Sequence, residues 1–121
     1  MDKAQAINNF WNSFDIPAYD ENTVPDGAAL PYITYEVVTS DFDHEVISSV
    51  DIWGRGRSWT EVTNLKDAIA DYIGLGGATA KYDGGMLWIK KDSTFARRTP
   101  DDNPDIRHIT LNIITEYISE V

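Results

Sequence analysis

The sequence predicts a single α+β domain spanning residues 1–121, a two-layer sandwich with two helices packed on one face of a mostly antiparallel sheet of four to five strands. Two segments carry apolar residues at helical spacing, and several others have the β-branched and aromatic composition of strands. Most connections between these segments are short, which favours antiparallel neighbours. Two amphipathic helices need one sheet face to cover, and this requirement predicts the two layers.

The first segment is expected to be an amphipathic helix that ends before Pro17. Its apolar residues fall at positions i, i+3, i+4 and i+7, namely Ile7, Phe10, Trp11 and Phe14. Pro17 lacks a backbone donor and restricts the residue before it, so the helix cannot continue through it. Residues 17–31 are rich in Pro, Asp and Asn, which predicts an irregular connection with a short strand near Ala18–Tyr19.

Two strands are expected after this connection. Residues 32–38 are mostly β-branched or aromatic on both faces, which is typical of a central strand. Residues 40–44 are predicted to form a polar turn. The next strand is expected over residues 45–54, with Val50 and Ile52 on one face and Trp53 on the other.

A second helix is predicted to begin at Ser58 and to run to about Ile73. Ser58 and Glu61 have the spacing of a capping box, in which each side chain bonds the backbone amide of the other residue. Gly74 supplies the left-handed residue that commonly ends a helix. The buried stripe of this helix is expected to contain Val62, Leu65, Ile69 and Tyr72 or Ile73.

A hairpin and a long final strand complete the predicted sheet. Residues 78–82 and 86–91 are the expected arms of the hairpin, joined by the turn Asp83-Gly84-Gly85. Residues 92–105 are polar, contain two prolines and are predicted to form a long loop. The last strand is expected over residues 106–118, with alternate apolar residues facing the core: Ile109, Leu111, Ile113 and Tyr117.

The charge of the chain is strongly negative and unevenly distributed. The net charge of −10 argues against general nucleic-acid binding, which requires a basic surface. Residues 1–54 carry Lys3 against ten acidic residues, whereas residues 55–121 carry nine basic and ten acidic residues. One interpretation is a generic acidic surface that keeps the protein in solution. The other is head-to-tail contact between unlike halves of neighbouring subunits, which closes into a ring if the rotation allows.

The sequence predicts no enzyme, no metal site and no cofactor. It has no cysteine, and His44 and His108 each stand without a second ligand at metal-binding spacing. The acidic run at residues 101–105 lacks the spacing and the terminal Glu of an EF-hand, so a solvated loop is favoured over a calcium site. Neither a signal peptide nor an apolar run long enough for a membrane span is recognisable, which predicts a cytoplasmic protein.

The candidate functional residues are interface residues. Lys90, Lys91, Arg97 and Arg98 flank Phe95 and form one basic cluster. Three interpretations of this cluster stay open: a solvated strand end, a docking site for an acidic partner, and a contact with nucleic acid, which the neighbouring acidic residues disfavour.

A second group of candidates lies near the middle of the chain. Trp53 is predicted to anchor a contact, because it opposes the apolar face of its strand and is followed by Arg55 and Arg57. Asp41 and Asp43, in the predicted turn, are the acidic candidates.

The order of these pieces resembles a known family. The pieces are Ile16-Pro17-Ala18-Tyr19, Val24-Pro25, the strand of residues 30–35, a strand ending at Trp53, a helix beginning at Ser58-Trp59, the hairpin of residues 83–90, Phe95-Ala96-Arg97 and a long last strand with Leu111-Asn112. This ordered set, which covers nearly the whole chain, is similar to the small tail-terminator or tail-completion proteins of long-tailed bacteriophages and prophages.

The resemblance implies a structural role in the virion and no catalysis. It implies a hexameric ring of identical subunits at the head-proximal end of the tail, where the ring ends polymerisation of the tube and joins the tail to the head. The implied partners are further copies of the chain, the major tail tube protein and the head–tail connector or stopper protein. DNA would pass through the ring without specific binding, and the subunit would stay in the host cytoplasm until assembly.

Two alternatives compete with this assignment. The first is a head-completion or stopper protein of the same connector stack, which has a similar size and ring symmetry. The second is a small ligand-binding α+β domain, which needs a concave pocket with convergent polar groups. The oligomeric state and the binding of tail tubes or head connectors discriminate among the three.

Overall fold

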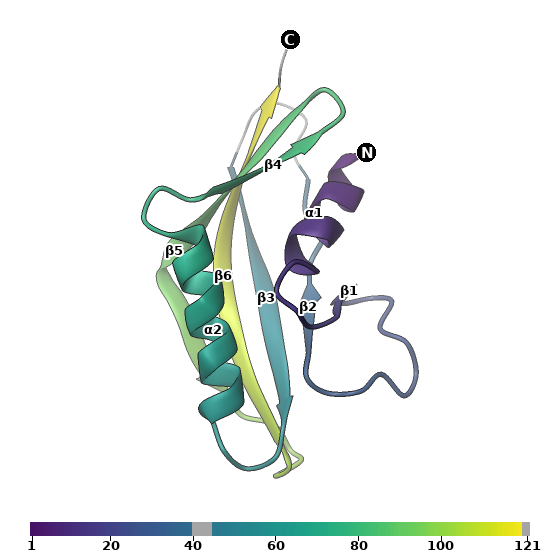
Figure 1. The fold of residues 1–121 in the computed structure, drawn as a ribbon, viewed down its shortest axis with the longest axis vertical. Helices are drawn as coiled ribbons and strands as arrows, with labels where there is room; N and C mark the ends of the chain where they lie inside the picture. Colours follow the sequence, from purple (N-terminus) through teal and green to yellow (C-terminus); the bar gives the residue numbers. More distant parts are fainter. Residues whose placement is uncertain (40–44, 120–121) are drawn as a thin grey trace.

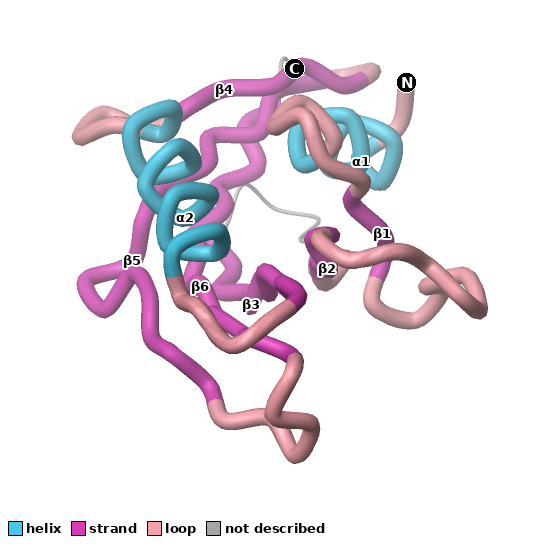
Figure 2. Tube along the Cα trace, turned by 60° about the horizontal axis from the view of Figure 1, so that its bottom comes forward, coloured by secondary structure: helices cyan, strands magenta, loops and turns pink. Residues whose placement is uncertain are grey.

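The computed structural model describes residues 1–39 and 45–119. Its elements follow in the order α1 (Lys3–Trp11), β1 (Ala18–Asp20), β2 (Tyr32–Tyr35), β3 (Glu45–Arg55), α2 (Thr60–Ile73), β4 (Ala78–Tyr82), β5 (Gly85–Thr99) and β6 (Ile106–Ser119). The six described strands form one sheet in the order β1-β2-β3-β6-β5-β4 (Figure 1). This sheet curls into a half-barrel, as Figure 2 shows.

Three long strands, β3, β5 and β6, form the middle of the sheet. β6 pairs antiparallel with β3 along its length, from Glu45 opposite Glu116 to Arg55 opposite Ile106, and on its other side it pairs with β5. The register between β5 and β6 shifts between Lys91 and Ala96, which marks a bulge. Strand twist accumulates over such long strands, and a bulge increases it locally, so the sheet curls instead of lying flat.

Alternate residues of the long strands face the inner side of the curl and form the core. Ile52, Leu87, Leu111 and Tyr117 are almost fully buried there. α2 lies along this inner side and contacts β3, β5 and β6. Helix and strand approach closely at Gly54, where an added Cβ would collide with Val62, so only glycine fits. The face of α2 that packs against the three strands carries its buried residues, Val62, Ile69 and Ile73.

α1 spans the opening of the curl, because it contacts both edge strands, β1 and β4. Its buried residues are Ala6, Ile7, Phe10 and Trp11. The rings of Phe10 and Trp11 meet edge to face at 4.9 Å between centroids, and Phe14 packs edge to face on Tyr72 of α2 at 5.4 Å. This aromatic group therefore joins α1 to α2 as well as to the sheet edges.

The predicted two-layer sandwich of four to five strands with both helices on one face is wrong. The described sheet has six strands and is curled, and α1 bridges its two edges rather than lying beside α2 on a flat face. The prediction treated the sheet as open and flat, whereas twist and the β5 bulge bring β1 and β4 close enough for one short helix to reach both.

Two local predictions are also corrected. Residues 92–105 are not a long loop, because β5 continues to Thr99 and only residues 100–105 connect it to β6. The expected capping box of α2 is absent, since Trp59 is the N-cap and makes no side-chain cap, while Ser58 Oγ accepts from the Thr60 amide at 3.2 Å. A capping box forms instead at α1, between Asp2 and Gln5.

The predicted starts of two strands agree with the structure. β3 begins at Glu45 and β6 begins at Ile106, as predicted, and the four residues expected to face the core from β6 are buried. β2 is shorter than predicted, because it ends at Tyr35. The predicted turn at residues 40–44 lies outside the described residues.

The buried phenol of Tyr117 makes stability depend on pH. Burial raises the pKa of Tyr117 to about 12, and nearby Tyr82 adds to the shift. An unfolded tyrosine loses its proton near its usual pKa of about 10, so folding should weaken as the pH rises from about 10 to about 12, by on the order of 2 kcal/mol. Urea unfolding at about pH 9 and about pH 11 measures this loss.

Tyr117→Phe should remove that dependence on pH, since no phenol remains to ionise. The substitution also deprives the Val38 carbonyl of the hydrogen bond that Tyr117 donates, so some stability is lost at every pH. Tyr72→Phe, at an exposed position, is the matched control. An unchanged fall in stability above about pH 10 in Tyr117→Phe would show that another group causes it.

Closure of the curl by α1 is tested by Trp11→Ala. Trp11 is 3% exposed, and its truncation should lower the free energy of unfolding by about 3–5 kcal/mol. Leu75→Ala, at a fully exposed leucine, should change it by less than about 0.5 kcal/mol. Chemical denaturation measures both values, and equal effects of the two substitutions would contradict the role assigned to α1.

Candidate functional site

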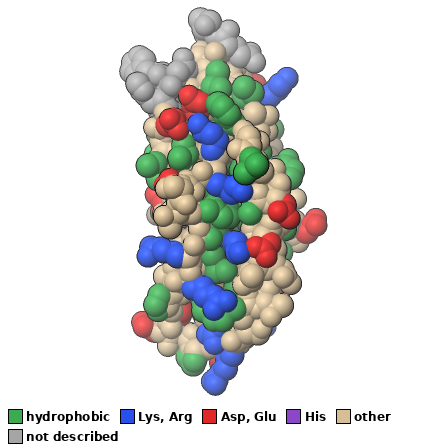
Figure 3. Space-filling view, turned by 90° about the vertical axis from the view of Figure 1, so that its left-hand side faces the viewer, with side chains coloured by type: hydrophobic (Ala, Val, Ile, Leu, Met, Phe, Trp, Pro, Cys, Tyr) green, Lys and Arg blue, Asp and Glu red, His purple; other side chains and the backbone are tan. Residues whose placement is uncertain are grey.

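The basic candidates lie on one side of the sheet, along β5. β4 pairs with β5 only as far as Ile89, so the rest of β5 is a free edge within the described part of the chain. Lys90, Lys91, Arg97 and Arg98 all lie on this stretch. Figure 3 shows Lys and Arg side chains following one another down this side of the molecule. The sequence placed these residues around a loop, but they lie on an extended strand.

Lys90 and Lys91, the first two basic residues of β5, both interact with other side chains of the same subunit. Lys90 Nζ lies 4.4 Å from the centre of the Trp88 ring, 3.3 Å from a Glu45 carboxylate oxygen and 3.8 Å from one of Glu116. Lys91 Nζ lies 5.8 Å from the ring centre of Phe95, which packs against the core. These lysines help to keep other strands from pairing with the exposed edge.

Arg98 is held by an aromatic ring and not by a carboxylate. Its guanidinium lies 4.6 Å from the centre of the Trp59 ring, and the Arg107 guanidinium lies 5.3 Å from the same ring. No ion pair or hydrogen bond links the side chain of Arg97 or Arg98 to another of the described residues. The Arg98 guanidinium therefore lies over an aromatic ring with its N–H donors unused.

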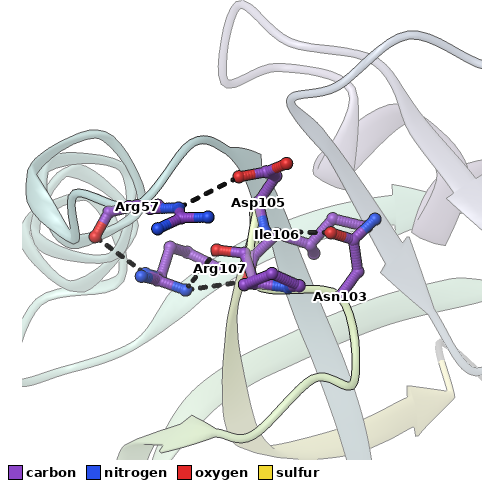
Figure 4. Close-up of polar contacts among 6 residues, drawn as sticks. Arg57, Asn103, Asp105, Ile106 and Arg107 are labelled. Atoms are coloured by element: carbon purple, nitrogen blue, oxygen red, sulfur yellow. Dashed lines mark hydrogen bonds and ion pairs between the residues drawn. The ribbon is translucent and has the colours of Figure 1, made fainter.

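Arg57 and Arg107 belong to a different network at the end of the sheet (Figure 4). Arg57 Nε pairs with Asp105 at 3.2 Å, and Arg107 donates to the backbone carbonyls of Arg57 and Pro104. In the same turn, the Asp105 amide donates to the Asn103 side chain. These two arginines fasten the connection between β5 and β6 to the start of α2.

A small cavity lies between α2 and β5 beside the free arginines. It has a volume of about 210 Å³ and is lined by Thr63, Lys66, Ala96, Arg97, Arg98 and Ile109. Lys66 Nζ pairs with Asp67 at 2.6 Å and is only about a quarter exposed. Lys66 and Arg98 bring cationic side chains from two elements to this cavity, and none of its lining residues is acidic. Arg97 borders the cavity from β5, but its side chain lies on the other face of the strand, because Arg97 pairs with Thr110, whose hydroxyl contacts Asp51. We call this group the basic cavity.

Acidic side chains gather on the opposite side of the sheet, around β1 and β2. Desolvation, together with the charges of Glu36, Asp51 and Asp20, raises the pKa of Glu21. Asp20, Glu36 and Asp51 each accept a hydrogen bond within the chain. The Glu21 carboxylate has no such partner among the described residues, although its backbone amide is held by the Tyr35 carbonyl at 2.9 Å.

Trp53 lies on the outer face of the curl in a cluster of polar and aromatic residues. It stacks on His108 with 3.8 Å between ring centres and donates to Thr34 Oγ1 at 3.0 Å. Asp51 Oδ1 lies 2.7 Å from His108 Nε2 and 2.8 Å from Thr110 Oγ1. Because Trp53 is half-buried by these contacts, it is less available than the sequence suggested; its role as an anchor stays a prediction.

An open groove lies at the start of α2. It has a volume of about 620 Å³, and its lining includes the apolar residues Ile16, Pro31 and Leu65 with Arg55 and Glu61 at its border. This groove places Arg55 away from the basic cavity. The polar residues around it come mainly from one turn of α2, so it does not supply the set of convergent polar groups that a ligand-binding domain requires.

The structure brings together only some of the predicted interface residues. Arg97 and Arg98 both border one cavity, but their side chains lie on opposite faces of β5. Arg55, Arg57 and Trp53 each lie in separate surroundings. Asp41 and Asp43 lie outside the described residues. Sequence reasoning missed Lys66 and Trp59, because only the packing of α2 on β5 brings them to the arginines, and no local motif signals that packing.

The outer-face cluster contributes to stability, and Asp51→Ala tests this. The substitution leaves His108 and Thr110, both buried, without their shared acceptor, so the free energy of unfolding should fall by about 1–3 kcal/mol. Asp67→Ala, which breaks the more exposed pair with Lys66, should cost less than about 1 kcal/mol. Urea denaturation compares the two, and a larger loss in Asp67→Ala would contradict this ranking.

The described residues contain no helix that is both long and apolar enough to cross a membrane. Within the same residues, no group of three or more His, Cys, Asp or Glu side chains is arranged to hold a metal ion. Comparisons with protein-family models, with curated proteins and with solved structures give no match.

Proposed function

We propose that this protein is a structural subunit of a long-tailed bacteriophage that forms a hexameric ring at the head-proximal end of the tail. The ring ends polymerisation of the tail tube and joins the tail to the head connector. The observation that carries the proposal is the separation of charge across the sheet: unpaired acidic charge lies on the β1–β2 side and unpaired basic charge on the β5 side.

Charge separated in this way favours head-to-tail contact between identical subunits. The acidic side of one copy complements the basic side of the next, and each copy keeps one of each surface for its two neighbours. Such a heterologous contact yields a closed ring when the rotation between subunits fits a whole number of copies.

The same contact suits a ring through which DNA passes. A basic surface left open toward the channel would bind the phosphate backbone and slow the passage of DNA. In the proposed ring the basic residues of β5 are covered by the neighbouring subunit, so the strongly acidic remainder of the chain faces the channel without attracting DNA.

A subunit that ends a tube must also offer no template for further addition. β1 has only three residues, and the free part of β5 carries Lys90, Lys91, Arg97 and Arg98. Short edge strands and charged edges are both features that oppose the pairing of another strand. These edges support a role at the end of a polymer rather than within it.

The proposal is tested with purified protein and tail tubes of the phage or prophage that encodes it. Negative-stain microscopy should show a ring on one end of each tube, and capped tubes should not lengthen when fresh tube protein is added. Raising the salt concentration should weaken ring formation, because exposed charge pairs are screened. Tubes incubated without the protein are the control.

Binding to head connectors without binding to tubes would contradict the terminator role and favour a head-completion protein. A monomer that ignores both tubes and connectors would contradict the structural assignment altogether.

A further inference from the structure

Leu75 is a fully exposed leucine on a turn whose shape is fixed. It follows α2 at 103% exposure and has a glycine on each side, Gly74 and Gly76. The Gly74 amide donates to the Ala70 carbonyl at 2.9 Å, and the Trp88 indole donates to the Gly76 carbonyl at 2.7 Å. The turn is therefore held at both ends while its leucine side chain stands in water.

The turn itself does not require a leucine. Its geometry comes from glycines, because Gly74 and Gly77 have φ of 65° and 84°, and a Cβ at Gly77 would lie 2.5 Å from the Trp88 indole nitrogen. Single exposed leucines are common on protein surfaces and need no partner. Leu75 differs because the same chain also carries an apolar groove that is open to solvent.

The groove at the start of α2 suits an aliphatic side chain. Ile16, Pro31 and Leu65 line it, and Ile16 and Leu65 are only partly buried against the core. Its volume of about 620 Å³ has room for a leucine side chain and part of the turn around it. Insertion of Leu75 would remove apolar surface of both partners from water, which is the main favourable contribution to most protein association.

The turn that carries Leu75 and the groove lie toward opposite ends of α2, whose 14 residues span about 21 Å (Figure 1). The two surfaces therefore cannot meet within one subunit. The turn is on the β5 side, where Trp88 holds it, whereas Ile16 and Pro31 shortly precede β1 and β2. These are the two sides that meet head to tail in the proposed ring.

Exposed charges beside the two surfaces are complementary. Asp71 lies one helical turn before Leu75, and Arg55 lies at the border of the groove. Neither forms an ion pair within the described part of the chain. Glu61 also lines the groove, but a carboxylate oxygen of Glu61 lies close to Gly54 of β3. A pair between Asp71 of one copy and Arg55 of the next would therefore orient the contact.

We propose that Leu75 of one subunit inserts into the groove of the next subunit in the ring. The partner is therefore a second copy of this chain. Because the turn and the groove are different surfaces, each copy uses both, and the contacts continue from copy to copy until the ring closes. This contact rests on the proposed ring and forms its apolar part.

Paired cysteines test this contact, because the chain has no cysteine of its own. The double variant Leu75→Cys with Asn64→Cys places one thiol on the turn and one at the groove. Roughly 15 Å of helix separates the two positions, whereas a disulfide needs Cα atoms within about 7 Å, so bonds can form only between copies. Mild oxidation of rings, alone or on tubes, should give a ladder of linked subunits on denaturing gels without reductant.

The matched control is Leu75→Cys with Lys81→Cys, which moves the second thiol to an exposed position on β4. It should form no such ladder.

Leu75→Ser supplies a second measurement that needs no cross-link. It should weaken ring formation about tenfold or more, because the contact loses a buried leucine. Negative staining of capped tubes and sedimentation velocity of the free protein measure this loss. Thermal unfolding should stay unchanged, since the side chain is fully exposed in the subunit, and this separates a lost contact from a lost fold.

The outcomes separate this inference from the proposed function. A ladder that the control lacks, together with loss of rings in Leu75→Ser, supports the contact. If rings form but give no ladder or the same ladder as the control, or if Leu75→Ser forms rings as the unchanged protein does, the contact is wrong while the ring proposal stands. If the unchanged protein forms no ring, alone or on tubes, both proposals fail together.

Discussion

The fold depends on the contact of α1 with both edges of the curled sheet. α2 covers β3, β5 and β6, but without α1 the gap between the edge strands β1 and β4 would leave one side of the core open to water. Phe10 and Trp11 fill this position, and Phe14 extends the contact to Tyr72 of α2. One short helix thus lets a single curled sheet enclose a core that a flat sheet of this size would need a full second layer to cover.

Curling the sheet also determines where charge can collect. The sides of a half-barrel face different directions, so acidic groups near β1 and basic groups on β5 cannot neutralise each other within one subunit. Each side keeps at least one unpaired group, Glu21 at one and Arg97 at the other. The asymmetry visible in the sequence halves therefore becomes an asymmetry of surfaces, which is the property that head-to-tail assembly needs.

The alternation of apolar residues in strands and their helical spacing in helices predicted the elements whose boundaries depend on nearby sequence. β3 and β6 begin where expected because their alternating apolar residues face the core. α2 ends where expected because Gly74 adopts the positive φ that ends a helix. The curl and the role of α1 were not predictable, since they arise from twist summed over several strands. Residues 92–99 seemed too polar for a strand, but an edge strand exposes most of its side chains. The basic cavity was only half predicted, because Lys66 reaches it, and Trp59 reaches Arg98, through tertiary packing.

The place of β6 has a consequence for how the chain folds. β6 is the last strand in the sequence, yet it lies in the middle of the sheet between β3 and β5. The strands before α2 and the hairpin after it share no ladder until β6 joins them. The sheet therefore assembles around its final segment, and the long sequence separation between β3 and β6 predicts folding in the slower range for small domains, milliseconds to seconds.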